Sequence, residues 1–246
     1  MKDITYIGEP VSDSATFKQL PIELQHFLLR QNGVVAYLGG IHIRGCCHEP
    51  AWHSLREVWH GETAFHKIYP VVKETDIPFA QDAVGNQFLL RAGKVWFLDT
   101  ETGQMEPLKV DFERFIVSVE RFPNEALDLS AVATFRKVGT YLQPGELLAV
   151  YPPTCIQTDG DLMRLTRMPV ETRLHSLADL FNQIRRLRPG QKIRLRTDEP
   201  RPQYPVSGEQ PAAPQASAET PAADSGAAPT AEVPAQPRPD EPAAEA

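Results

Sequence analysis

Cysteine and long apolar runs are scarce in this chain. It contains 3 cysteines in 246 residues, and two of them, Cys46 and Cys47, are adjacent. So few cysteines make no disulfide framework, and we expect a reducing cytoplasm as the location. No run approaches the roughly 18 apolar residues that a membrane helix needs, and residues 1–6 lack the apolar stretch of a signal peptide. We therefore expect a cytoplasmic protein with no membrane partner.

Net charge is absent from most of the sequence. Residues 1–197 contain 23 acidic and 23 basic side chains, whereas residues 198–246 contain nine acidic side chains and two arginines. These last 49 residues also hold 11 of the 23 prolines and a single aromatic residue, Tyr204. Such a segment cannot bury enough apolar surface to offset the entropy lost on ordering. The sequence predicts a disordered, acidic Pro/Ala-rich tail over residues 198–246.

Common catalytic motifs are also missing. The chain has no GxSxG elbow, no Walker phosphate loop and no GxGxxG fingerprint after a strand. The prominent carboxylates stand where turns and helix caps require them, namely Asp76, Asp82, Asp99, Glu101 and Asp111. We therefore expect a protein that is not an enzyme, with no catalytic residues, no cofactor and no small-molecule substrate.

The clearest positive signal is an antiparallel meander over residues 76–104. Two apolar runs, 88–90 and 95–98, flank a short loop that contains Gly93, which is typical of a β-hairpin. Asp82 with Gly85 and Asp99 with Gly103 supply turn residues before and after it. Because both runs are apolar at consecutive positions, we expect both faces of this sheet to be covered.

Other elements follow from periodicity and capping signals. Helices are expected at 20–31, 50–61, 111–119 and 125–138, and a further helix from Ser176, where Ser176 and Asp179 form a capping-box pattern. Strands are expected at 34–37, 41–43, 147–151, 162–168 and 192–197. The chain is thus predicted to have an α+β fold.

The order of these elements resembles the SUKH superfamily. The resemblance rests on LPIELQHFLLRQNG at 20–33, DIPFAQDAVGNQFLL at 76–90 and GKVWFLDTETG at 93–103. It implies a SUKH-like domain over residues 1–124, with helices packed on a meander sheet. Residues 125–197 lie outside the match, and we expect an α/β extension packed on this domain, because about 70 residues make a marginal core alone.

The resemblance also implies a function. The superfamily includes bacterial toxin-immunity proteins and fungal regulators of cell-wall synthesis, which bind other proteins. We therefore expect a non-catalytic protein-binding module that neutralises a toxin effector, with a regulatory scaffold of the cell-wall type as the alternative. The candidate binding residues lie in the loop and helix before the meander, and they are Arg44, His48, His53, Arg56 and His60.

A concentration of histidine and cysteine offers a second alternative. Seven of the chain's ten histidines and cysteines fall between positions 42 and 66. If residues 51–60 are helical, His53, Glu57 and His60 share a solvent-facing side. His48 or a cysteine of the preceding loop could join them around a metal in an enzyme. The spacing matches neither a CxxC pair nor an HExxH helix. We therefore expect no metal, and cysteines that serve the structure of the loop.

A basic stretch near the end of the predicted globular part raises the question of nucleic acid. Its six cations are Arg185, Arg186, Arg188, Lys192, Arg194 and Arg196. The first three are expected at a helix C-terminus, where the helix dipole favours cations. The last three alternate with apolar residues, as on an exposed strand face, and no aromatic residues interleave them as base-stacking platforms. We therefore expect no nucleic-acid partner.

Overall fold

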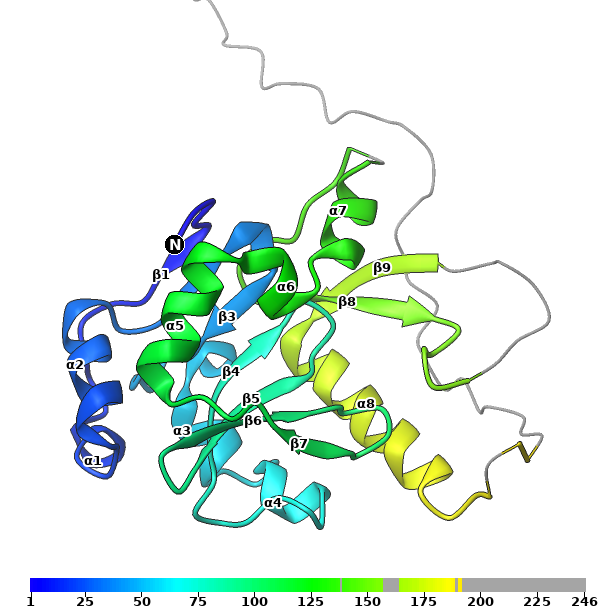
Figure 1. The fold of residues 1–246 in the computed structure, drawn as a ribbon, viewed down its shortest axis with the longest axis horizontal. Coiled ribbons are helices and arrows are strands. Elements are labelled where there is room, and N and C mark those ends of the chain that lie inside the picture. The colour runs from blue at the N-terminus through cyan, green and yellow to red at the C-terminus, as the bar shows by residue number, and fades with distance from the viewer. Residues whose placement is uncertain (138, 157–163, 189, 192–246) are drawn as a thin grey trace, which may run out of the picture. The chain divides into compact units, whose positions relative to one another are not determined.

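A computed structural model describes residues 1–137, 139–156, 164–188 and 190–191 of the chain. The predicted strand at 192–197 and the predicted tail at 198–246 lie outside the described residues. Figure 1 shows an α+β fold in which helices surround one main sheet, as the sequence predicts. Among the described residues, no helix is both long and apolar enough to cross a membrane.

The main sheet is an antiparallel meander of seven strands in sequence order. They are β1 (Tyr6–Ile7), β2 (Val34–Ala36), β3 (Ile41–Ile43), β4 (Ile77–Asp82), β5 (Gln87–Arg91), β6 (Lys94–Leu98) and β7 (Met105–Pro107). The predicted strands at 34–37 and 41–43 and the predicted hairpin are therefore confirmed. In the hairpin, Arg91 pairs with Lys94. The turn residues Ala92 and Gly93 have φ of 49° and 74°, which is typical of the type I′ turns that suit the twist of a hairpin.

Burial on both faces is confirmed for the centre of this sheet. All six residues of β4 are buried, and so are the first four of β5. The exposure rises in β6, where Lys94 is exposed and both Trp96 and Phe97 are half-buried. The neighbouring strand β7 is short and largely exposed, so the meander is fully covered only away from this edge.

One face of the sheet is covered by α5 (Phe112–Arg121). Asp111 caps this helix by accepting a hydrogen bond from the Arg114 amide, as the sequence predicts. The ring of Phe115 lies 5.6 Å from that of Phe79 and 4.8 Å from that of Phe88, measured between centroids. These aromatic contacts fix α5 against the two central strands. The predicted helix at 20–31 is observed as α2 (Ile22–Arg30), preceded by the short α1 (Ser14–Phe17).

Three helix predictions are wrong in their boundaries. Residues 50–61 form a 3-10 turn, η2 (Ala51–His53), and a separate helix, α3 (Leu55–Trp59), because Ser54 is extended with ψ of 120°. Residues 125–138 likewise divide into α6 (Pro123–Leu127) and α7 (Ser130–Arg136), separated by the left-handed Asp128. The last helix, α8 (Val170–Ile184), begins six residues before Ser176, whose hydroxyl donates to the Arg173 carbonyl inside the helix.

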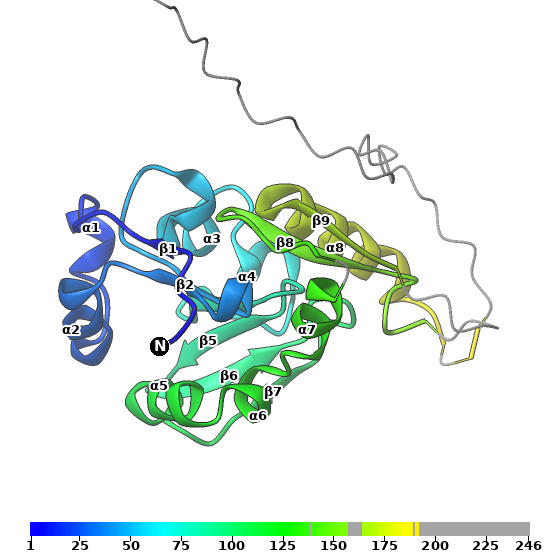
Figure 2. The ribbon, with the colours of Figure 1, turned by 90° about the horizontal axis from the view of Figure 1, so that it is seen from above.

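The remaining elements complete the other side of the molecule. The short α4 (Phe65–Ile68) lies between β3 and β4 in the chain. The strands β8 (Glu146–Tyr151) and β9 (Arg164–Pro169) form an antiparallel hairpin, which confirms the described part of the two strands predicted there. In Figure 2 the strands of the meander lie between α5 and α6 on one side and α3 and α8 on the other.

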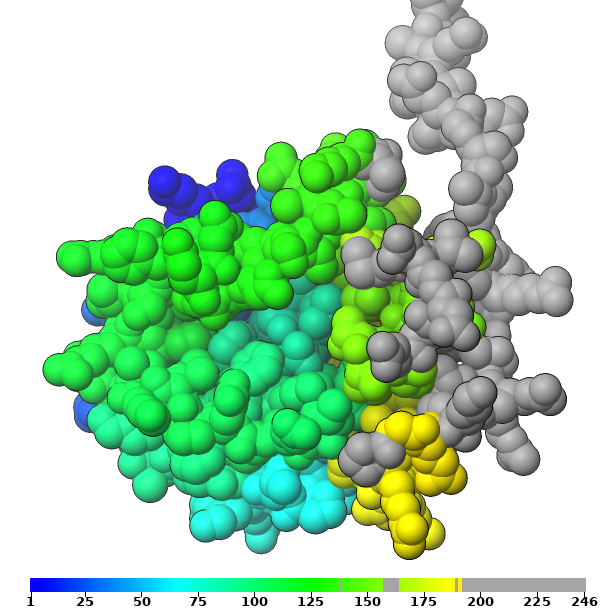
Figure 3. All heavy atoms as spheres, turned by 45° about the vertical axis from the view of Figure 1, so that its right-hand side comes forward, coloured from blue at the N-terminus to red at the C-terminus, as the bar shows by residue number. Residues whose placement is uncertain are grey.

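The described part of residues 125–197 packs directly on the meander. The Leu148 amide donates to the Ala83 carbonyl at 2.7 Å, and the ring of Phe181 lies 4.8 Å from that of Tyr69. A buried ion pair of 3.7 Å joins Arg173 of α8 to Glu101, in the turn that follows β6. Figure 3 shows the side chains of this C-terminal part lying against those of the sheet. The boundary at residue 124 stays a prediction.

Candidate binding site

The structure divides the five candidate binding residues into two groups. His48, Arg56 and His60 are exposed. Arg44 is 1% exposed and His53 is 0% exposed, so the expectation that these two lie on the surface is wrong. His53 belongs to η2, before the break at Ser54, and therefore does not share a face with α3.

Arg44 lies in a polar row that crosses the buried sheet. His42 on β3 pairs in register with Gln81 on β4, which pairs with Gln87 on β5, so the three side chains share one face. The Arg44 guanidinium donates to Gln81 Oε1, to Gln87 Oε1 at 2.8 Å and to the Pro78 carbonyl at 2.8 Å. No described carboxylate lies within ion-pair distance of it, and its Nε has no partner among the described residues. Burial lowers the pKa of Arg44 to about 9.

The row continues through two stacked imidazoles. His53 Nε2 lies 2.9 Å from the Asn32 carbonyl. A carbonyl only accepts, so this nitrogen carries the proton. His53 Nδ1 must then accept from His42 Nε2 at 2.9 Å, and His42 Nδ1 accepts from Gln81 Nε2 at 3.1 Å. The hydrogen bonds thus run in one direction from Arg44 to Asn32, with both imidazoles neutral, and burial lowers the pKa of both histidines.

The surroundings of His53 leave no room for a ligand. A Cβ atom at Gly33 or Gly45 would lie 2.5 Å or 2.7 Å from the imidazole ring, and the rings of Tyr6 and Trp52 pack edge-on against it. Since both ring nitrogens are also hydrogen-bonded, His53 is not available to a metal. The structure therefore does not bring together the predicted set of His48, His53, Glu57 and His60. No group of three or more His, Cys, Asp or Glu side chains in the described part of the chain is arranged to hold a metal.

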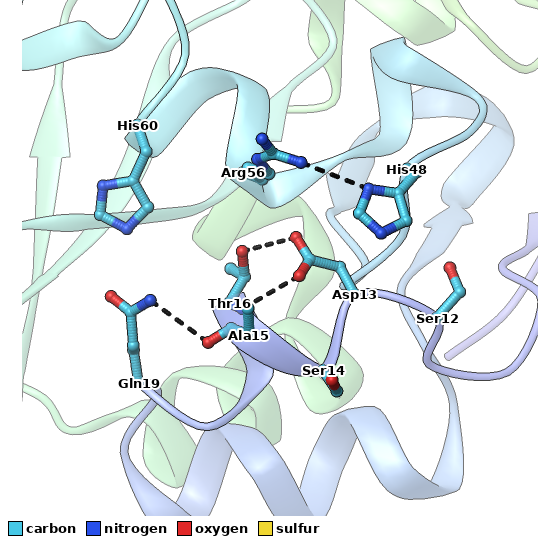
Figure 4. Close-up of a pocket in the computed structure, with 9 residues that line it drawn as sticks. All are labelled: Ser12, Asp13, Ser14, Ala15, Thr16, Gln19, His48, Arg56 and His60. Atoms are coloured by element: carbon cyan, nitrogen blue, oxygen red, sulfur yellow. Dashed lines mark hydrogen bonds between the residues drawn. The ribbon is translucent and has the colours of Figure 1, made fainter.

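The three exposed candidates surround one hollow, of about 370 Å³. Figure 4 shows His48, Arg56 and His60 above the segment that contains α1. The lining consists of these three side chains and of Ser12, Asp13, Ser14, Ala15, Thr16 and Gln19. Ligand pockets for small molecules are mostly apolar cavities of roughly 300–1,000 Å³. This hollow lies at the small end of that range and is open, and all of its described lining residues except Ala15 are of polar types. It therefore fits a side chain of a partner better than a cofactor.

The hollow has two walls: one carries His48, Arg56 and His60, and the other consists of the lining residues between Ser12 and Gln19. Buried hydrogen bonds hold the two walls together. The Ser12 and Asp13 amides each donate to the Cys46 carbonyl at 3.1 Å. Asn32 accepts from the Cys46 amide at 2.8 Å and donates to the Glu9 carbonyl at 2.7 Å. The same Asn32 receives the hydrogen bond from His53, so the polar row and the hollow share one anchoring residue.

Cys46 and Cys47 are buried within this frame and are free thiols. Burial raises the pKa of Cys46 to about 12 and that of Cys47 to about 11. Both side chains are therefore neutral thiols at physiological pH, which makes them poor nucleophiles. Their position agrees with the expectation that they serve the structure of the loop.

Among the described residues that line the hollow, the one carboxylate is already hydrogen-bonded. Asp13 is 3% exposed, and its two oxygens accept from the Thr16 amide at 3.1 Å and the Thr16 hydroxyl at 2.6 Å. Burial acts to raise the pKa of Asp13, but these hydrogen bonds and the charges of His48 and Arg56 outweigh it and lower the pKa. Asp13 therefore stays ionised and caps α1, and it presents almost no free surface to a partner.

The groups that remain free in the hollow include the Arg56 guanidinium, which is its strongest hydrogen-bond donor. Arg56 Nη1 contacts His48 Nδ1 at a long 3.4 Å, and no described carboxylate lies within 4.0 Å of its guanidinium. His60 stacks on Trp59 with ring centroids 4.2 Å apart, which fixes the plane of its imidazole. Burial lowers the pKa of His60, although the charge of Glu74 opposes this shift.

Sequence reasoning found one wall of the hollow and missed the other. The second wall centres on Asp13, and its local signal is an Asp followed three residues later by Thr16, which is typical of a helix N-cap. That signal predicts a helix start but not its neighbour, because the contact with residues 48–60 depends on the backbone bonds to Cys46.

The basic stretch is described only in part. Arg185, Arg186 and Arg188 are exposed and directly follow α8, as expected for cations at a helix C-terminus. The predicted positions of Lys192, Arg194 and Arg196 lie outside the described residues. The absence of a nucleic-acid partner stays a prediction.

The chain was also compared with known proteins. No family model matches it, and neither a curated protein nor a solved structure does.

Proposed function

We propose that this chain is a non-catalytic, cytoplasmic protein-binding module of the SUKH type, and that it acts as an immunity protein. It would neutralise a toxin effector by covering the surface that the effector needs. The observation that carries this proposal is the gathering of His48, Arg56 and His60, all exposed, around one polar hollow.

The frame beneath the hollow supports a binding role. Arg is among the residues that most often dominate interface energetics, and a rigid binding surface loses less entropy on association. Here the loop that carries His48 is tied to Asn32 through Cys46, and Asn32 also closes the buried row of His42, His53 and Gln81. The exposed side chains are therefore presented by an ordered scaffold.

Co-expression with a toxin effector encoded beside this chain tests the proposal. We expect the chain to restore growth and to co-purify with the effector. Arg56→Asp should weaken both effects, because it reverses a charge in the hollow. Arg136→Asp is the matched control, since Arg136 is an exposed arginine at the end of α7, a helix that lies well away from α1 in Figures 1 and 2.

Absence of both rescue and a complex would contradict the immunity proposal. If Arg56→Asp and Arg136→Asp reduced growth rescue and co-purification equally, the assignment of the binding surface to the hollow would be contradicted. A stable complex with another protein of the cell, without growth rescue, would favour the regulatory scaffold. Stoichiometric zinc or iron in the purified protein would favour the metal-dependent enzyme.

A further inference from the structure

The hollow offers a partner positive charge and hydrogen-bond donors. Its neutral acceptors include hydroxyl groups and the side-chain oxygen of Gln19, whose amide nitrogen donates to the Ala15 carbonyl. Among the described residues that line it, the one carboxylate is that of Asp13, which Thr16 engages through both oxygens. Its exposed ionisable groups are Arg56 and the imidazoles of His48 and His60. A ligand that satisfies this set must supply acceptor oxygens and negative charge.

From this arrangement we infer that the hollow recognises a carboxylate side chain, an aspartate or glutamate, on the surface of the protein partner. Arg56 would be the central contact, because a guanidinium binds a carboxylate through two parallel hydrogen bonds. His48 and His60 would flank the bound carboxylate. The inference rests on the proposed function and adds the chemistry of the partner to it.

The contacts of Arg56 in the free protein favour such a ligand. Its one hydrogen bond among the described side chains is the 3.4 Å contact to His48 Nδ1, which is longer than a strong charge-assisted bond of about 2.7–2.9 Å. A carboxylate would therefore replace a weak contact with a strong one. Once bound, it would also favour the protonated form of the flanking His60 imidazole, so binding should tighten as the pH falls.

Other charged groups around the hollow limit this pH effect. Asp13 faces His48 and Arg56 across the hollow and remains ionised. Around His60, burial and the charges of His66 and Arg56 disfavour protonation, whereas Glu74 and Asp13 favour it. By mass action, a carboxylate that binds the protonated His60 imidazole more tightly must raise the pKa of His60. A raised pKa of His60 in the complex is thus a direct signature of carboxylate binding.

Nuclear magnetic resonance of the full-length chain tests the inference with hexaglutamate as the probe. We expect saturable shifts of the His48 and His60 ring signals, a raised pKa for His60, and tighter binding at pH 6 than at pH 8. Arg56→Gln should weaken binding at least about tenfold, since it removes a charge-assisted contact. Arg136→Gln should leave binding unchanged, and both variants should keep the native unfolding temperature.

The comparison probes are hexalysine, hexaserine and inorganic phosphate. Ring shifts with hexalysine or hexaserine equal to those with hexaglutamate, or equal affinity in the Arg56→Gln variant, would overturn the inference. Binding of phosphate without binding of hexaglutamate would also overturn it, because the ligand would then be a phosphoryl group. If hexaglutamate fails while the co-expressed effector still co-purifies, the binding function stands and only the partner chemistry is wrong.

Discussion

Two of the candidate binding residues are arginines, and they differ in burial. Arg44 and Arg56 were both expected at a binding surface, yet Arg44 is 1% exposed and Arg56 is exposed. Arg44 donates to two glutamines and a backbone carbonyl. Such a buried cation is tolerated only while these acceptors remain in place. Its contribution is therefore to the order of the core, whereas the exposed Arg56 is left for the binding role proposed above.

Stability measurements separate the two roles. Arg44→Ala removes three hydrogen bonds and leaves a cavity, so we expect a loss of about 3–5 kcal/mol in the free energy of unfolding. Arg56→Ala should change it by less than about 0.5 kcal/mol, as is usual for exposed positions. Urea unfolding of the two variants measures both values. Equal effects would contradict the assignment of Arg44 to the core.

The paired histidines make stability depend on pH. His42 and His53 have pKa values lowered by burial, so at mildly acidic pH the unfolded chain binds protons that the folded chain does not. Stability is therefore complete above the ordinary histidine pKa of about 6.5 and is lost as the pH falls below it. Asp82 changes the stability in the opposite direction. Burial raises its pKa to about 6, so the folded chain takes up this proton before the unfolded chain does, and the contribution increases stability as the pH falls.

A variant isolates the contribution of the histidines. We expect His42→Asn to be less stable than the parent at pH 7.5 and to lose less additional stability between pH 7.5 and pH 5.5. Asp82 is present in both proteins, so its contribution cancels in the comparison. Denaturant midpoints at the two pH values give the result, and His26→Asn, at an exposed position on α2, is the control. If His42→Asn and the parent lost the same amount of stability between pH 7.5 and pH 5.5, the buried pair of His42 and His53 would not titrate as described.

At the scale of elements, local signals worked where local chemistry decides the structure. The hairpin at 91–94 follows from two apolar runs around Gly93, and the cap of α5 from Asp111. Ser54 shows where local sequence signals fail to predict the structure. It interrupts the predicted helix because the Gly45 amide bonds to the His53 carbonyl and the Leu55 amide to the Gly45 carbonyl. These bonds join distant segments, and no sequence periodicity reports them.

Two glycines in the meander give a matched test of turn chemistry. Gly93 and Gly103 both have positive φ, of 74° and 70°. An added Cβ at Gly93 meets nothing within 4 Å, whereas one at Gly103 would lie 2.3 Å from Phe181 Cε2. Gly93→Ala should therefore cost about 1–2 kcal/mol, from backbone conformation alone, and Gly103→Ala clearly more. Urea unfolding ranks the two, and the reverse order would contradict the docking of α8 on this turn.

At the scale of the whole molecule, one buried carboxylate links the meander to the C-terminal part. Glu101 accepts from the Thr154 hydroxyl at 2.8 Å and from the Cys155 amide at 3.0 Å, and it pairs with Arg173. In the sequence Glu101 stands only as a turn residue before Gly103. Its long-range role could not be predicted, because it depends on how residues 125–197 fold back onto the sheet.

Removal of this carboxylate tests whether the two parts unfold together. Glu101→Ala leaves the 6% exposed Arg173 side chain without this partner, so we expect a loss of about 3–5 kcal/mol. Unfolding should remain a single transition in both the parent and the variant. Glu106→Ala, at an exposed position on β7, should change stability by less than about 0.5 kcal/mol. Two separate transitions in the parent would show that the C-terminal part folds independently.

Amide hydrogen exchange, measured for the chain alone and in complex with the proposed effector, tests the proposed binding surface most directly. The account predicts new protection in residues 12–19 and 48–60, which form the two walls of the hollow. The buried strands β4 and β5 should exchange slowly in both states. Protection confined to another surface, such as α5 or β9, with no change around Arg56, would contradict it.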